Sequence, residues 1–172
     1  MDEKRRLELF NDIVSTYSER LYWHIRDMVG THEDTDDLLQ DVFVKIWAAL
    51  PSFRGDAQLF TWIYRIATNE TLNFLRKQKI RSVLSFEQIT AAEDRIDADP
   101  YFDGDDAQTV LAKAIAKLPA KQRAVFTMRY YDEMKYEDIA EILHTSVGAL
   151  KASYHIVYEK IKKELKNNSI DF

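Results

Sequence analysis

Polar side chains suited to nucleic-acid binding gather on one face of a helix predicted for residues 57–77. At about 100° per residue, this group falls within an arc of roughly 80°. Its members are Arg65, Arg76, Asn69, Asn73 and Trp62. Guanidinium groups bind phosphate, amides bond base edges and an indole ring stacks on an unpaired base. The pattern is therefore typical of a surface that binds separated strands, and Lys77 extends its basic end.

The aromatic residues near this helix allow two interpretations. Trp62 is either a base-stacking residue or ordinary core, and Phe53 and Phe60 either pack the preceding loop or hold an extruded base. Asn69 and Asn73 favour the binding interpretation more strongly, because an amide in the middle of a helix gains little in helix propensity or burial.

A second binding motif lies near the carboxyl end. Helices predicted at Tyr136–Leu143 and at about Val147–Leu165 are separated by three residues, which is the helix-turn-helix spacing. The second of these helices begins with side chains suited to groove and backbone contacts, with an aromatic among them: Ser146, Lys151, Ser153, Tyr154 and His155. The alternative is a plain helical hairpin used for packing.

One further surface suits a protein partner. On the helix that precedes Pro51, acidic and amide side chains line up beside small ones: Asp37, Gln40, Asp41, Val44 and Ala48. Such a strip can dock against a basic helix of another protein, and the alternative is a solvated helix face.

Apolar periodicity predicts the elements that position these surfaces. Stripes at Leu7–Val29, at Leu38–Leu50 with a cap at Thr35 or Asp36, and at 57–77 predict a three-helix bundle. After it, a stripe from Val110 to Leu118 leads to Pro119 in the first turn of a further helix. The sequence thus predicts an all-α chain of two small helical domains.

The segment between the domains differs in composition. Residues 81–106 carry two basic and eight acidic side chains, which gives the segment a net charge of −6. This is more negative than the net charge of −5 of the whole chain of 172 residues. Since this segment also lacks sustained periodicity, it predicts a flexible acidic linker with a brief contact through Phe86 and Ile89. The predicted boundaries are 1–79 for the first domain, 80–106 for the linker and 107–172 for the second domain.

Several classes of protein are excluded. The chain has no cysteine, so disulfides and thiol chemistry are absent. It lacks a phosphate-binding glycine loop and a nucleophile elbow, and its single Glu-x-x-His match, Glu141 to His144, lacks the second copy that a carboxylate-bridged metal site needs. No signal peptide or membrane-spanning stretch is evident. We predict a cytoplasmic, non-enzymatic protein without cofactor, metal or membrane insertion.

Two blocks of sequence resemble the signature regions of bacterial RNA polymerase sigma factors, specifically the extracytoplasmic-function (ECF) group of the sigma-70 family. They are DLLQDVFVKIWAALPSFRGDAQLFTWIYRIATNETLNFLRK and LPAKQRAVFTMRYYDEMKYEDIAEIL. The resemblance implies sigma domains 2 and 4 joined by a linker, and a subunit that recruits core RNA polymerase to promoters and helps to melt the DNA. It also implies an anti-sigma factor as a regulator.

The resemblance assigns a partner to each surface. The strip from Asp37 to Ala48 matches the surface for the polymerase β′ clamp helices, and the β subunit is the other core partner. The segment from Phe53 to Lys77 matches the part that binds the −10 element, and the helix from Ser146 matches the −35 recognition helix.

The recognition helix departs from the family pattern. Ser153, Ile156 and Tyr158 stand where arginines are usual, and His144 replaces a usual turn glycine. Fewer cations weaken phosphate binding, so we expect weaker or altered −35 recognition. Two other classes compete with a sigma factor: a sigma-like mimic that titrates an anti-sigma factor without initiating transcription, and an ordinary dimeric helix-turn-helix repressor.

Overall fold

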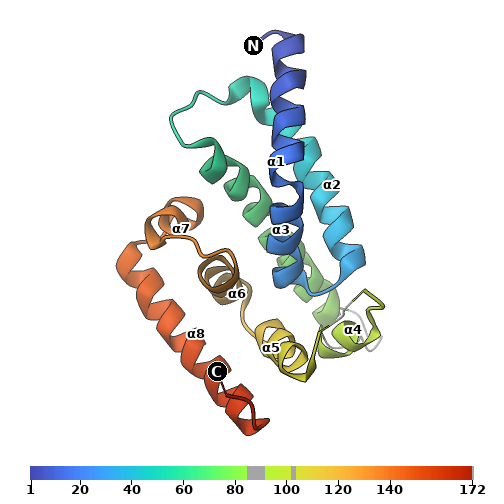
Figure 1. The fold of residues 1–172 in the computed structure, drawn as a ribbon, viewed down its shortest axis with the longest axis vertical. Helices are drawn as coiled ribbons and strands as arrows, with labels where there is room; N and C mark the ends of the chain where they lie inside the picture. Colours follow the sequence, from blue (N-terminus) through green and yellow to red (C-terminus); the bar gives the residue numbers. More distant parts are fainter. Residues whose placement is uncertain (85–91, 102–103, 172) are drawn as a thin grey trace.

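Every regular element that the structure describes is a helix, which confirms the predicted all-α class. The computed structural model describes residues 1–84, 92–101 and 104–171. The first part of the chain contains α1 (Glu3–Val29), α2 (His32–Ala49), the short turn η1 (Leu50–Ser52) and α3 (Leu59–Leu84). The later elements are α4 (Ala92–Ala98), α5 (Asp106–Ala116), α6 (Ala120–Phe126), the wide turn η2 (Thr127–Tyr131), α7 (Tyr136–Leu143) and α8 (Val147–Asn167) (Figure 1).

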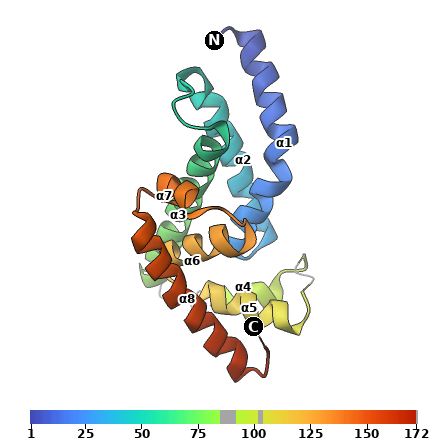
Figure 2. The same cartoon turned by 60° about the vertical axis from the view of Figure 1, so that its left-hand side comes forward.

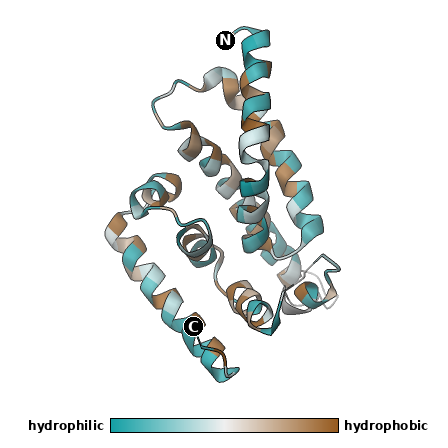
Figure 3. Cartoon of the chain, viewed as in Figure 1, coloured by the Kyte–Doolittle hydropathy of each residue, from teal (hydrophilic) through white to brown (hydrophobic). Residues whose placement is uncertain are grey.

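Helices α1, α2 and α3 pack into the predicted three-helix bundle. The apolar stripes supply its core, which includes Ile13, Leu21, Val42, Ile46 and Ile63. In Figure 3 the long helices carry hydrophilic and hydrophobic residues on different sides, as expected when one side faces a core.

The second helix begins earlier than the sequence predicts. We expected a cap at Thr35 or Asp36, but Thr31 is the cap and its hydroxyl accepts from the Asp34 amide. Thr35 is instead buried in the first turn, where its hydroxyl donates to the carbonyl of Thr31. Glu33 and Asp34 lie in the first helical turn, where negative charge is favourable.

The helix-turn-helix spans closely match the sequence prediction. Helix α7 ends at Leu143, and Ser146 caps α8 by accepting from the Ala149 amide at 3.2 Å. His144 lies between them with φ 52° and ψ 45°, the left-handed region that favours glycine. His144 therefore takes the backbone conformation of the glycine that it replaces, which costs a non-glycine residue some strain.

Part of the segment expected to be a flexible linker is helical. Helix α4 buries Ile96 against the turn between α1 and α2, where a Cβ on Gly30 would lie 3.4 Å from the Ile96 side chain. The buried Arg26 guanidinium pairs with Asp99 at 2.8 Å, and Lys113 pairs with Asp97. Arg95 also makes a longer contact of 3.8 Å with Asp34, so one apolar residue and three ion pairs hold a segment that has no periodicity of its own. Phe86 and Ile89 lie outside the described residues.

The two halves of the chain share one continuous core. Residues of α6, η2 and α7, among them Ala124, Met128 and Ile139, join the bundle residues in a single apolar cluster. Figures 1 and 2 show α6 between the bundle and α8, with α4 and α5 near the carboxyl end of α1. A second, smaller cluster lies between α5, α6 and α8.

Candidate nucleic-acid interface

The polar face predicted on α3 is exposed along most of its length. Asn69, Asn73, Arg76 and Lys77 are all exposed, and the Arg76 guanidinium donates to the Asn73 amide oxygen at 3.2 Å. This part of the face offers amides and cations side by side to a ligand.

Among the cations and amides of this face, Arg65 is the exception. It is half-buried, and its guanidinium approaches the backbone carbonyl of Glu141 at 3.4 Å and the Glu141 carboxylate at 3.5 Å. Glu141 belongs to α7, which packs on α3. The structure therefore holds Arg65 in a contact between the two halves, which the helical arc alone did not reveal.

The aromatic residues at the start of α3 pack on one another. Trp62 is half-buried against Phe53, with ring centroids 4.9 Å apart, and Phe60 lies 4.5 Å from Tyr64 with the Arg20 guanidinium 5.3 Å from its ring. Trp62 and Phe60 both pack against the bundle core. All three rings nevertheless keep part of their surface open, so packing and base contact are compatible here.

The strip on α2 is open along its whole length. Asp37, Gln40, Asp41, Val44 and Ala48 are all exposed, and the Val44 side chain keeps 67% of its surface accessible. In the part of the chain that the structure describes, none of the five side chains makes a hydrogen bond or an ion pair. The opposite side of α2 packs on α1 and α3, so the strip is a rigid surface without an internal partner.

The residues predicted on the recognition helix differ in their exposure to solvent. Ser146, Lys151 and His155 are exposed on α8, and Ser153 is half-buried. Tyr154 instead packs inward, stacked on Phe126 with centroids 5.9 Å apart and an interplanar angle of 15°. Burial is the largest cause that raises the pKa of the Tyr154 phenol. Tyr154 therefore serves packing in this arrangement.

A buried polar contact between the halves was missed from the sequence. His24 on α1 is fully buried, and its Nδ1 lies 2.6 Å from the Asp132 carboxylate while its Nε2 lies 2.9 Å from the Thr68 hydroxyl. Asp132 follows η2, so this histidine joins α1, α3 and the second half. We call His24, Thr68 and Asp132 the interdomain clasp. Its only sequence signal is a histidine beside the apolar stripe of α1.

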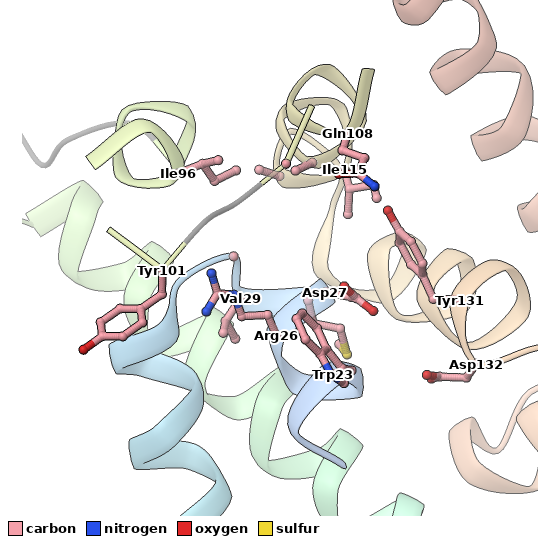
Figure 4. A pocket seen from close by; sticks show the side chains of 15 residues that line it. Trp23, Arg26, Asp27, Val29, Ile96, Tyr101, Gln108, Ile115, Tyr131 and Asp132 are labelled. Carbon is pink, nitrogen blue, oxygen red and sulfur yellow. The ribbon is translucent and has the colours of Figure 1, made fainter. Parts of the chain in front are cut away.

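A cavity of about 510 Å³ opens beside the clasp (Figure 4). Trp23, Asp27 and Tyr131 lie on its walls, together with Ile96 and Gln108. Burial, with a contribution from Asp132, raises the pKa of Asp27 to about 7. Burial also raises the pKa of Tyr131, and the nearby Asp27 adds to this. The interface thus contains a carboxyl group that titrates near neutral pH.

The described residues show neither a metal cluster nor a membrane segment. No group of three or more carboxylate and histidine side chains is placed to hold a metal ion in the ranges that the structure describes. Within the same ranges, no helix is both long and apolar enough to cross a bilayer.

Comparison with known proteins identifies both halves. The family model for sigma-70 region 2 matches residues 13–80, and that for sigma-70 region 4 matches residues 108–156. The ECF RNA polymerase sigma factor SigW of Bacillus subtilis is 31% identical over 170 residues, which cover 93% of this chain and 90% of that protein.

Two solved structures share the fold. CnrH in complex with the cytosolic domain of CnrY aligns with a TM-score of 0.70 at 24% identity and covers 94% of this chain and 90% of its own. The sigma factor RpoE of Bartonella quintana, in complex with the anti-sigma factor NepR, aligns with a TM-score of 0.71 at 23% identity. The alignment covers 91% of this chain and 96% of RpoE.

Proposed function

This chain belongs to the ECF group of the sigma-70 family, and from this premise we propose how its surfaces divide the work of a sigma factor. The α2 strip docks on the β′ clamp helices of core RNA polymerase. The α3 face reads the −10 element, and α8 contacts the −35 element. The functional units follow the predicted boundaries 1–79, 80–106 and 107–172, and the protein acts in the cytoplasm without enzymatic activity of its own.

The observation that carries the docking assignment is the α2 strip. Its two carboxylates are exposed and make no hydrogen bond or ion pair within the described chain, although exposed acidic residues elsewhere pair, as Asp97 does with Lys113. A row of unpaired carboxylates beside the exposed Val44 suits a basic helix with an apolar contact.

The first test is binding of the labelled chain to core RNA polymerase, with the housekeeping sigma factor as competitor. Saturable binding that the competitor displaces is the expected result. If the folded chain does not bind core polymerase when free of inhibitor, the mimic that titrates an anti-sigma factor becomes the better assignment.

Charge reversal of the strip tests the surface itself. We expect the double variant Asp37→Lys, Asp41→Lys to bind core polymerase about tenfold more weakly, because attraction becomes repulsion at an exposed interface. Asp12→Lys, Glu19→Lys is the matched control, since it makes the same charge change at exposed positions of α1. Equal affinity of the strip variant and the wild type would refute this docking surface.

The α3 face has its own test. We expect Asn69→Ala, Asn73→Ala to keep core binding and to lower promoter opening about tenfold, because the two amides would bond unpaired bases. Opening can be measured by the permanganate reactivity of unpaired thymines, on a promoter selected with the wild-type chain from a random library. Asn11→Ala, Asn167→Ala is the control. Unchanged opening would remove these asparagines from the binding surface.

The structure shows the two halves packed against each other, and we call this the closed form. The closed form supports regulation by a partner. Arg65, on the proposed −10 face, is held by Glu141 of α7, and the interdomain clasp ties the same two halves. A partner that favours this closed form lowers the population able to bind promoter DNA. An anti-sigma factor is the class of partner that we propose, and it binds both domains at once.

A further inference from the structure

A groove of about 690 Å³ runs between the carboxyl half of α3 and the α4–α6 side of the second half. Its described lining contains no acidic side chain. Cations from α3, α4, α6 and the end of α5 surround it, and of these Lys117 pairs with Glu164 at 2.9 Å. They are Arg76, Lys79, Arg95, Lys117, Lys121 and Arg123. Such a concentration of one charge is unusual in a chain whose net charge is −5.

Arg123 forms the rigid base of this groove. Its guanidinium donates to three backbone carbonyls, those of Met28 at 2.9 Å, Ala116 at 2.6 Å and Leu118 at 3.1 Å. These neutral acceptors fix the side chain but leave its charge uncompensated, and its buried Nε has no hydrogen-bond partner. Burial, and then repulsion from Arg95, lowers the pKa of Arg123 to about 10. A charge held in this way favours a nearby anion.

Arg95 adds a second guanidinium with little compensation. Its guanidinium makes a loose contact of 3.8 Å with Asp34, and its Nε is buried without a hydrogen-bond partner among the described residues. Arg95 and Arg123 are both half-buried, and their charges repel each other. An anion between them would relieve this repulsion.

The remaining lining residues indicate a compact ligand. Lys79 of α3 and Lys121 of α6 are exposed at the rim of the groove, and neither side chain makes a hydrogen bond or ion pair within the described chain. Leu72, Leu118 and Pro119 supply apolar surface beside the cations. The volume is within the range of small-molecule sites and is larger than a single phosphate needs.

We propose that this groove binds a small polyphosphate anion, either inorganic or carried by a nucleoside. The phosphate groups lie between the two arginines and the rim lysines, since cations and phosphate oxygens form charge-assisted hydrogen bonds. The apolar part accommodates a base when a nucleoside is attached. The site is separate from the α2 strip and from α8.

Occupancy would act on the equilibrium between closed and open forms. The ligand contacts both halves of the chain, and a ligand that binds only the closed form stabilises it by mass action. It would also occupy the space beside Asn73 and Arg76. This regulatory consequence rests on the proposed function, whereas binding itself does not.

The test is calorimetric titration of the full chain with tripolyphosphate, at about 0.15 M ionic strength. We expect saturable binding at one site and about tenfold weaker binding for Lys79→Ala, Lys121→Ala. Lys162→Ala, Lys163→Ala is the matched control, because it removes the same charge from exposed positions of α8. Helical content and thermal midpoint are measured on every variant, and both pairs are exposed, so we expect them to fold.

The outcomes separate the possible ligands. Tighter binding of ATP than of tripolyphosphate assigns the site to a nucleotide, and equal binding assigns it to inorganic polyphosphate. Equal weakening in the control variant, or equal binding of sulfate at the same ionic strength, would overturn the proposal. It would also be overturned if a single-stranded oligonucleotide binds through Lys79 and Lys121 while tripolyphosphate does not. Because no polymerase is present, failure here leaves the sigma factor assignment untouched.

Discussion

Replacing His24 by alanine is expected to destabilise the chain by about 4 kcal/mol. The imidazole is fully buried and bonds to Asp132 and Thr68. Alanine would leave the Asp132 carboxylate without its partner at the interface and would open a cavity between the halves. The two costs act on the same contact, so this one substitution weakens both packing and polar pairing.

Urea denaturation of the wild type and of His24→Ala measures the difference in their free energies of unfolding. Small-angle scattering reports whether the two halves separate. His155→Ala is the matched control because His155 is exposed on α8, and we expect little change from it. Thr68→Val, which removes only one of the two bonds, should have a smaller effect of about 1 kcal/mol. A change below about 1 kcal/mol for His24→Ala would show that the interdomain clasp does not form in solution.

Replacing Asp27 by asparagine is expected to remove a large part of the pH dependence of stability. Burial raises the pKa of Asp27 to about 7 from the ordinary value of 3.8, so the folded chain binds a proton that the unfolded chain has already released. Stability therefore falls as the pH rises from about 4 to about 7, and the full cost is present above pH 7. The corresponding difference is on the order of 4 kcal/mol.

The free energy of unfolding of the wild type and of Asp27→Asn is compared at pH 5 and at pH 8. Asp27→Asn should be the more stable protein at pH 8, and its advantage over the wild type should be clearly smaller at pH 5. Asp12→Asn, at an exposed position of the same helix, controls for the loss of charge. Asp132→Asn should move the transition to lower pH, because the Asp132 charge contributes to the raised pKa of Asp27. Parallel stability curves for Asp27→Asn and the wild type would contradict this account.

Apolar periodicity and cap residues were sufficient to predict the helices whose ends carry a clear capping or turn signal. The turn at His144–Ser146 was predictable because a cap residue and two short apolar stripes lie within a few positions of one another. The exposed strip on α2 and the run from Asn69 to Lys77 were predictable for the same reason, since helical periodicity alone places them opposite a core face.

The acidic segment shows where local signals fail. Helix α4 contains seven residues, too few to be stable alone, and its single fully buried side chain in the described part is Ile96. It is held by groups distant in sequence, such as Arg26 and Gly30. Composition correctly indicates that such a segment has no core of its own, yet it says nothing about a core supplied by another part of the chain.

Residues close together in the chain are enough to predict the helices with apolar stripes, the outward faces of α2 and α3, and the family. Which polar residues meet depends on the folded chain. It paired Arg65 with Glu141, turned Tyr154 inward, buried His24 between the halves and surrounded Arg123 with cations and carbonyls. The physical reason is that burial and charge compensation depend on the sum of all neighbours, and these neighbours are up to 108 positions apart.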